Sequence, residues 1–231
     1  MSPKVKVQPA GPERLPRGRH KLSPQVVRAS QRERLLRAML DLVAARGYEA
    51  TTVPDVVARA RVSRNAFYAL FADKLDCFLS LCDEEAGDML DELLHPRDTD
   101  DWVQALRAGA ELYLRWWQER PAFSRTYFVE LPAAGPRAIE QRDRQYARFR
   151  RMFELLGAWA REQQPELPAL SPLVPRMLVV ATTELVAEEV RRGHTGQLAE
   201  LADELVFLMV GLLADDATAT LRRPEFGQPH L

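Results

Sequence analysis

The chain has 231 residues, of which 46% are hydrophobic and 28% are charged, so it can fold as one sizeable domain or two small ones. This composition excludes disorder over most of the length, and no stretch of about 18 uncharged apolar residues could span a membrane. The net charge of -1 conceals a balance of +8 over residues 1–80 and -9 over residues 81–231. Unless chance segregated these charges, they indicate a polyanion-binding head on a soluble body.

Residues 1–29 are predicted to form a flexible basic arm. Five prolines interrupt this segment, no helical apolar repeat is present, and the stretch from Arg14 to Lys21 is densely basic. From Ser30 onward, apolar residues recur on one face of a predicted helix that Gly47 would end. Because no apolar secretory signal is present, we expect a cytoplasmic, nucleoid-associated protein.

Residues 30–75 have the pattern of a small domain with two short, capped helices. Thr52 precedes Val-Pro-Asp, which predicts an N-cap, a proline in the first turn and an acid placed for a capping box. Ser63 is expected to cap the next helix, and Asp73 a longer one. Two short helices joined by a tight turn predict a helix-turn-helix, whose second helix enters the major groove of DNA.

The second short helix begins with side chains suited to reading DNA. Arg64 can pair with guanine and Asn65 with adenine, while the Ser63 hydroxyl and the open amides beside it can bind a phosphate. Tyr68 lies one turn further along and can reach a phosphate oxygen. The alternative is a plain three-helix bundle whose capping residues have no part in recognition, but the motif order and the basic charge favour DNA binding.

Helical patterns continue over residues 76–216, and residues 217–231 are expected to form a C-terminal tail. Apolar and aromatic residues recur at helical spacing near 102–120, 123–131, 137–161, 172–192 and 196–214. No segment alternates with the period of two that is typical of a strand. The predicted fold class is therefore all-α: a three-helix DNA-binding domain followed by a helical ligand-binding and dimerisation domain, with about nine helices in all.

Between Gln31 and about Asp83, many residues occur in one fixed order and spacing. They read Gly47-Tyr48-x-x-Thr51-Thr52-Val53-x-Asp55-Val56-Val57 and then Val62-Ser63-Arg64-x-x-Phe67-Tyr68-x-x-Phe71-x-Asp73-Lys74. This stretch resembles the TetR family of transcription regulators. The remaining two thirds of the chain are similar to that family only in helical organisation and length.

Two positions depart from the family pattern. The turn between the short helices usually has glycine, so a left-handed backbone at Arg61 would be strained, although this side chain could add a phosphate contact. Leu70 replaces the histidine of the usual Tyr-x-His-Phe, which removes any DNA contact made by that histidine.

The predicted DNA contacts come from the arm and the small domain. Lys74 begins a helix, where a cation is electrostatically unfavourable, and this local conflict favours a phosphate contact over a solvated lysine. Arg17 and Arg19 resemble the basic extension of several family members and could enter the minor groove, or they could belong to a solubilising tail. The full predicted set is Arg17, Arg19, Thr52, Ser63, Arg64, Asn65, Tyr68 and Lys74.

Aromatic residues concentrate between positions 102 and 159, where most are expected to form the core. The family resemblance implies a small-molecule pocket in this helical body, and a mostly apolar cavity with a few polar groups is typical of such sites. We hypothesise a hydrophobic or aromatic effector. The residues expected to line its pocket are Tyr113, Trp117, Tyr127 and Phe149, with Thr183 or Glu184 supplying polarity.

The last two predicted helices, near 172–192 and 196–214, carry more apolar residues than one buried stripe requires. Pairing with a second copy in a four-helix bundle would cover them, as the family resemblance also implies. Such a homodimer would place two recognition helices about 34–36 Å apart and bind a palindromic double-stranded operator. The usual family outcome is a repressor released by ligand; the alternatives are an activator, or a protein that works through protein contacts without sequence-specific DNA binding.

No enzymatic activity, cofactor or metal site is predicted. The sequence lacks a Gly-x-Ser-x-Gly elbow, a phosphate-binding glycine loop and a His-Glu-x-x-His pair. Cys77 and Cys82 would diverge on one helix with no histidine cluster nearby, so we expect both to be buried as small apolar side chains.

Overall fold

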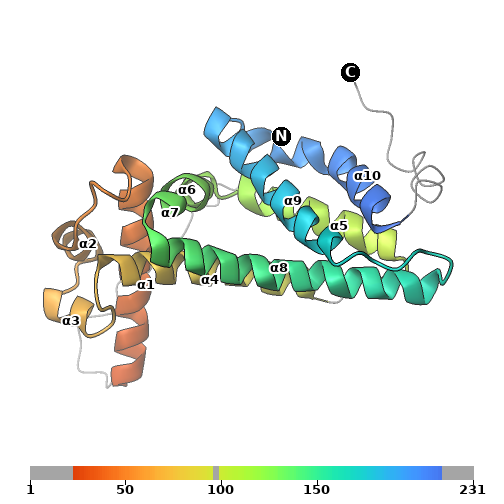
Figure 1. Cartoon of the computed structure of the whole chain (residues 1–231). Coiled ribbons are helices and arrows are strands. Elements are labelled where there is room, and N and C mark those ends of the chain that lie inside the picture. Colours follow the sequence, from red (N-terminus) through yellow and green to blue (C-terminus); the bar gives the residue numbers. More distant parts are fainter. Residues whose placement is uncertain (1–22, 96–98, 215–231) are drawn as a thin grey trace, which may run out of the picture.

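The structure, a computed structural model, describes residues 23–95 and 99–214, and every regular element in these ranges is helical. The elements (Figure 1) are α1 (Pro24–Arg46), α2 (Val53–Ala60), α3 (Arg64–Tyr68), α4 (Lys74–Leu94), α5 (Trp102–Gln118), α6 (Pro121–Arg125), a π-helix (Thr126–Glu130), α7 (Leu131–Ala133), α8 (Pro136–Gln163), α9 (Leu173–Arg192), a 3₁₀-helix (Thr195–Leu201) and α10 (Ala202–Leu213). The all-α prediction is confirmed.

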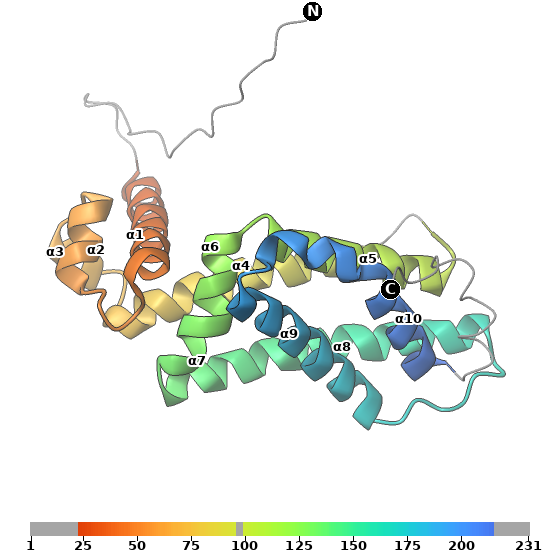
Figure 2. The same cartoon turned by 90° about the horizontal axis from the view of Figure 1, so that it is seen from above.

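Helices α1, α2 and α3 form a head at one end of the molecule, and both views show it set apart from the remaining helices (Figures 1 and 2). Leu35 and Met39 of α1 and Phe67 of α3 are fully buried between these helices. Burying such side chains stabilises a fold by roughly 1.5–3 kcal/mol each. The three predicted helices thus share a buried face, and their core is continuous with that of the body.

The predicted helix caps of the head are confirmed. Thr52 and Asp55 form a reciprocal capping box at the start of α2. The Ser63 hydroxyl accepts a hydrogen bond from a backbone amide of α3 at 3.1 Å, and the Asp73 carboxylate does the same for α4 at 2.6 Å. Each cap satisfies an amide that the helix itself leaves without a partner.

Helix α1 begins six residues earlier than the apolar pattern suggested. The Ser23 hydroxyl accepts from the Val26 amide, and Pro24 occupies the first turn, where its missing N–H breaks no helical hydrogen bond. Placing residues 24–29 in the non-helical arm was therefore wrong. Arg17 and Arg19, like the predicted tail at 217–231, lie outside the described residues.

The body is organised around α4, which leaves the head and packs along α8 (Figure 1). Helix α5 packs against α10 and the 3₁₀-helix, while α9 packs on α8. The expected aromatic core is present, because Trp102, Trp117, Phe123 and Phe153 are all at most 1% exposed. Cys77 and Cys82 are both buried and form no disulfide, as expected.

Two segments of the body differ from the expected regular helices. The short piece predicted at 123–131 contains a π-helix, a rare element that often occurs at functional sites, and helical backbone continues to Ala133. The helix predicted at 196–214 begins as a 3₁₀-helix and becomes α-helical only at Ala202. None of the described helices combines the length and apolar character that a membrane span requires.

Candidate DNA-binding surface and ligand cavity

Helix α3 presents the predicted base-reading residues on the outside of the head. Phe67 is fully buried and anchors the helix, whereas Arg64 and Asn65 are exposed and Tyr68 is 53% exposed. Within the described residues, neither Arg64 nor Asn65 makes a side-chain hydrogen bond or ion pair, so their donors and acceptors face solvent. A capped helix with an outward arginine, asparagine and tyrosine has the chemistry needed to contact base edges and phosphates.

Two residues of the predicted DNA-contacting set have intramolecular partners. Thr52 is engaged in the capping box, and its hydroxyl lowers the pKa of Asp55. The Lys74 ammonium donates to the Tyr48 carbonyl at 3.0 Å and lies 3.9 Å from the centroid of the Tyr48 ring. These contacts explain the cation at the start of α4 without a phosphate, although an ammonium has three donors and Tyr48 occupies one.

The turn of the helix-turn-helix contains the strained residue expected from the missing glycine. Arg61 is left-handed, with φ 53° and ψ 47°, and it is the one non-glycine residue with positive φ in the described ranges. Arg34 of α1 donates to the carbonyls of Ala60 and Arg61 at 3.2 and 3.4 Å. This bridge closes the end of α2 and was not predicted, because Arg34 lies 26 residues away in sequence.

Glu130, the last residue of the π-helix, connects the body to the head. Its carboxylate accepts a hydrogen bond from the Tyr48 amide at 2.9 Å and lies 3.7 Å from Arg125. A Cβ at Gly47, which has φ 84°, would approach the same carboxylate to 3.2 Å. On the other side of the joint, Arg137 lies 3.4 Å from Asp73. Glu130 was missed because its partner is 82 residues away.

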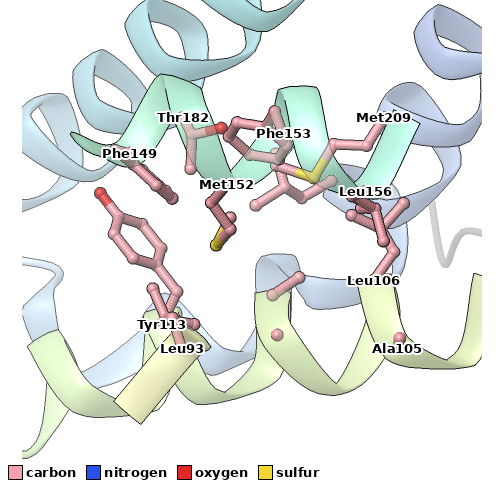
Figure 3. A pocket seen from close by; sticks show the side chains of 13 residues that line it. Leu93, Ala105, Leu106, Tyr113, Phe149, Met152, Phe153, Leu156, Thr182 and Met209 are labelled. Carbon is pink, nitrogen blue, oxygen red and sulfur yellow. The ribbon is translucent and has the colours of Figure 1, made fainter. Parts of the chain in front are cut away.

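The body contains an apolar cavity of about 100 Å³ between α5 and α8. Figure 3 shows Tyr113 and Phe149 at one end of this cavity and Leu156 and Met209 at the other. Its full lining is Leu93, Ala105, Leu106, Gly109, Ala110, Tyr113, Phe149, Met152, Phe153, Leu156, Thr182, Leu205 and Met209. All of these except Tyr113 and Phe149 were missed, since no local pattern shows which helices converge.

A second cavity of about 20 Å³ adjoins the first and shares Tyr113 and Phe149 with it. Three further residues of the predicted pocket, Trp117, Tyr127 and Thr183, line this smaller space. The five residues thus converge, divided between two neighbouring cavities.

Glu184 is the exception among the predicted pocket residues. Its side chain is 65% exposed and pairs with Arg191, so it lines neither cavity. Successive residues on a helix point about 100° apart, and Thr183 takes the inward direction. The expectation that Glu184 supplies polarity to this pocket is corrected accordingly.

The small cavity is lined by two residues whose buried polar atoms lack hydrogen-bond partners of good geometry within the described residues. The Tyr113 hydroxyl and the Trp117 indole N–H are both unpaired within the described part of the chain. Burial is the main reason that the pKa of Tyr113 is raised, while the nearby Trp117 N–H partly offsets the increase. The phenol therefore stays protonated at physiological pH. Among the described residues, no cluster of histidine, cysteine and acidic side chains could hold a metal ion.

The fold and the exposed, capped α3 define a helix-turn-helix DNA-binding protein. Residues 35–81 match the family described as bacterial regulatory proteins, tetR family. This segment contains the predicted helix-turn-helix, and the solved structures that the whole fold resembles include transcriptional regulators.

Relatives extend the likeness to the body. The HTH-type transcriptional activator FasR of Mycolicibacterium smegmatis is 26% identical over 132 residues, which span 57% of this chain and 55% of that protein, about half of its length. The transcriptional regulator FadR from Bacillus subtilis, in complex with stearoyl-CoA, superposes with a TM-score of 0.68 at 15% identity over 78% of this chain and 98% of that chain. A SmeT–triclosan complex gives a TM-score of 0.69 at 18% identity, covering 82% of this chain and 94% of that chain.

Proposed function

We propose that the protein is a ligand-responsive transcriptional repressor that binds a palindromic operator as a homodimer and leaves it when a small hydrophobic or aromatic effector binds. The observation that carries this proposal is the outward face of α3, where Arg64 and Asn65, beside the exposed Tyr68, have no partner among the described residues. Side chains that can pair with guanine and adenine are thus available at the start of a capped helix. Arg17 and Arg19 are proposed to add contacts in the minor groove.

A homodimer through α9 and α10 is supported by the apolar side chains that these helices expose. Leu173, Met177 and Val180 of α9 are 46–54% exposed, and Leu208 and Leu212 of α10 are 59% and 41% exposed. Large apolar residues gathered on one face are typical of an interaction surface rather than of scattered exposure. A second copy covers the same face symmetrically, and this sets the spacing of the two heads.

Release by an effector is supported by a continuous series of contacts from the cavities to the head. Tyr127 of the π-helix lines the small cavity, and its ring centroid lies 5.1 Å from that of Trp117. Three residues later in the same helix, Glu130 accepts the hydrogen bond from Tyr48 at the end of α1. A ligand that displaces Tyr127 would shift the attachment of the head, and a coupling of about 1–3 kcal/mol changes operator affinity roughly 5- to 150-fold.

Activation is the second candidate mode of control. It is favoured by the match to FasR, which is named a transcriptional activator. The same DNA-binding surface serves either mode, because the sign of control depends on where the operator lies relative to the promoter.

The test is selection of bound duplexes from a random pool at physiological salt, using the full chain and a version that begins at Ser23. Recovery of one inverted repeat by the full chain supports the proposal, and a weaker consensus for the shorter version assigns DNA contacts to residues 1–22. Affinity for the selected duplex should fall steeply between 50 and 200 mM salt, as expected for roughly 6–10 phosphate contacts. Absence of any enriched sequence would contradict operator binding and favour a role through protein contacts.

A further inference from the structure

Two buried hydrogen-bond donors converge at the boundary of the two cavities. The Tyr113 hydroxyl belongs to a side chain that is 2% exposed, and Trp117 is 1% exposed. Neither polar atom makes a hydrogen bond of good geometry among the described residues, although the Trp117 N–H lies near the Tyr113 oxygen. A buried polar group without a hydrogen bond destabilises the fold, so a pair of such groups beside one cavity indicates an absent acceptor.

Two other polar side chains of the small cavity, Gln145 and Thr183, already have partners. The Gln145 amide donates to the Asp83 carboxylate, and the Thr183 hydroxyl donates to the Val179 carbonyl at 2.6 Å. An indole N–H can only donate, and the protonated phenol also has a hydrogen to donate. The two unpaired groups therefore require a hydrogen-bond acceptor rather than a donor.

Charged side chains are missing from the described walls of both cavities. Among residues 23–95 and 99–214, no lysine, arginine, histidine, aspartate or glutamate lines either space. An ionised carboxylate or phosphate placed between Tyr113 and Trp117 would be buried without a counter-charge, which is strongly unfavourable. The acceptor that fits this site is uncharged.

The lining of the larger cavity indicates the chemistry of the rest of the ligand. In Figure 3 the Tyr113 hydroxyl points away from the end of the cavity that holds Ala105 and Leu106. In Figure 3 Met209 lies at that end and Met152 lies between the two ends, and the unbranched chains of both methionines adapt to different apolar shapes. A ligand with its acceptor at Tyr113 would therefore extend an apolar portion toward Leu156.

We propose that the effector is an uncharged molecule with an apolar chain and a carbonyl-type acceptor, which accepts hydrogen bonds from the Tyr113 hydroxyl and the Trp117 indole while its chain fills the cavity beside Met152 and Met209. This assignment rests on the proposed function, since it names the chemical class of the ligand for the same body. Tyr113 and Trp117 are then the residues that determine specificity for an acceptor, and the methionines determine only size.

The test uses three probes of matched length on the full chain: methyl heptyl ketone, octyl chloride and nonanoate. Calorimetric titration at neutral pH should show the ketone binding about tenfold more tightly than octyl chloride, because the chloride is a poor acceptor. Nonanoate should bind at least about tenfold more weakly than the ketone, because its charge would be buried.

Variants identify the donors. Tyr113→Phe and Trp117→Phe should each reduce the ketone-to-chloride affinity ratio by about fivefold. The ratio is taken within each variant, so a general loosening of the body cancels. Trp159→Phe, which removes an indole N–H from a residue that lines neither cavity, should leave the ratio unchanged.

Equal affinity for ketone and chloride, an unchanged ratio in both cavity variants, preferred binding of nonanoate, or no binding of any probe would overturn the inference. An unchanged ratio would mean that water occupies the two donors permanently; the small cavity, at about 20 Å³, is large enough for one molecule. Ketone selectivity without any effect on operator binding would support the ligand class while contradicting the proposed function. Operator release by nonanoate, with no ketone binding, would support the proposed function while contradicting the ligand class.

Discussion

The head and the body differ in where their unpaired polar groups lie. In the head, the buried Thr51 hydroxyl donates to the Gly47 carbonyl at 2.8 Å, and the groups that lack partners, such as Arg64 and Asn65, lie outside. In the body, by contrast, unpaired polar atoms are buried on α5, at Tyr113 and Trp117 beside the cavities.

This difference shows where each region has hydrogen-bonding groups available for a binding partner. Unpaired groups on a surface are hydrated and become useful when a large partner such as DNA displaces the water. Unpaired groups in a cavity destabilise the empty body and are satisfied only by a molecule small enough to be enclosed. The head is therefore suited to a polyanion that stays outside, and the body to a ligand that enters.

The largest expected effect concerns the dimer, without which neither region can work as proposed. Leu208→Glu, at a position 59% exposed, should leave the monomer folded and place two charges in the symmetric apolar interface. We expect a monomer by sedimentation at micromolar concentration and an operator affinity reduced by at least about 100-fold, since the two half-sites no longer bind together. Leu155→Glu on α8, 48% exposed, is the matched control and should remain dimeric. A dimeric Leu208 variant would contradict pairing through α10.

The proposed DNA binding through the exposed face of α3 is tested by Arg64→Ala. Loss of a bidentate contact to guanine should reduce operator affinity roughly 5- to 150-fold and relax the preference at one base pair of each half-site. Arg59→Ala provides the control, because that arginine is also exposed but pairs with Asp41 at 2.8 Å. Fluorescence anisotropy on the selected duplex measures both. Equal losses in the two variants would show that α3 contributes only general positive charge.

The joint between the two regions is tested by Glu130→Ala, which removes the acceptor of the Tyr48 amide. We expect the ligand-induced change in operator affinity to shrink by about fivefold, while ligand affinity of the free protein changes less than about twofold. Arg125→Ala deletes the other partner of Glu130 and keeps the hydrogen bond to the head. Operator titrations with and without ligand provide the measurement, and an undiminished response in Glu130→Ala would place the coupling elsewhere.

The smallest expected effect comes from the strained turn of the head. A left-handed conformation costs a non-glycine residue about 1–2 kcal/mol, and the greater freedom of glycine in the unfolded chain offsets part of that. Arg61→Gly should therefore stabilise the protein by about 0.5–1 kcal/mol in urea denaturation. Arg61→Ala keeps the strain while removing the side chain, so it should not stabilise. A gain of the same size in both would assign the effect to the guanidinium instead.

The sequence alone was sufficient for features that depend on neighbouring residues. The capping box of Thr52, the caps at Ser63 and Asp73, and the strain at Arg61 follow from contacts within about four positions, and all were predicted. The start of α1 was misplaced although its signal was local, because Pro24 was interpreted as a helix breaker instead of a first-turn residue.

Features that depend on how the helices are rotated and packed together could be seen only in the tertiary structure. Thr183 and Glu184 are adjacent and equally plausible from the pattern, yet only the rotation of α9 directs one inward and the other toward Arg191. Likewise, α5 shows which residues are apolar but not that Tyr113 and Trp117 lose water without gaining partners. Local hydrogen bonds are determined by sequence spacing, whereas burial depends on every helix packed around a residue. The sequence by itself therefore determined the capped helix-turn-helix segment, and the packing of the helices decided the cavities and the joint at Glu130.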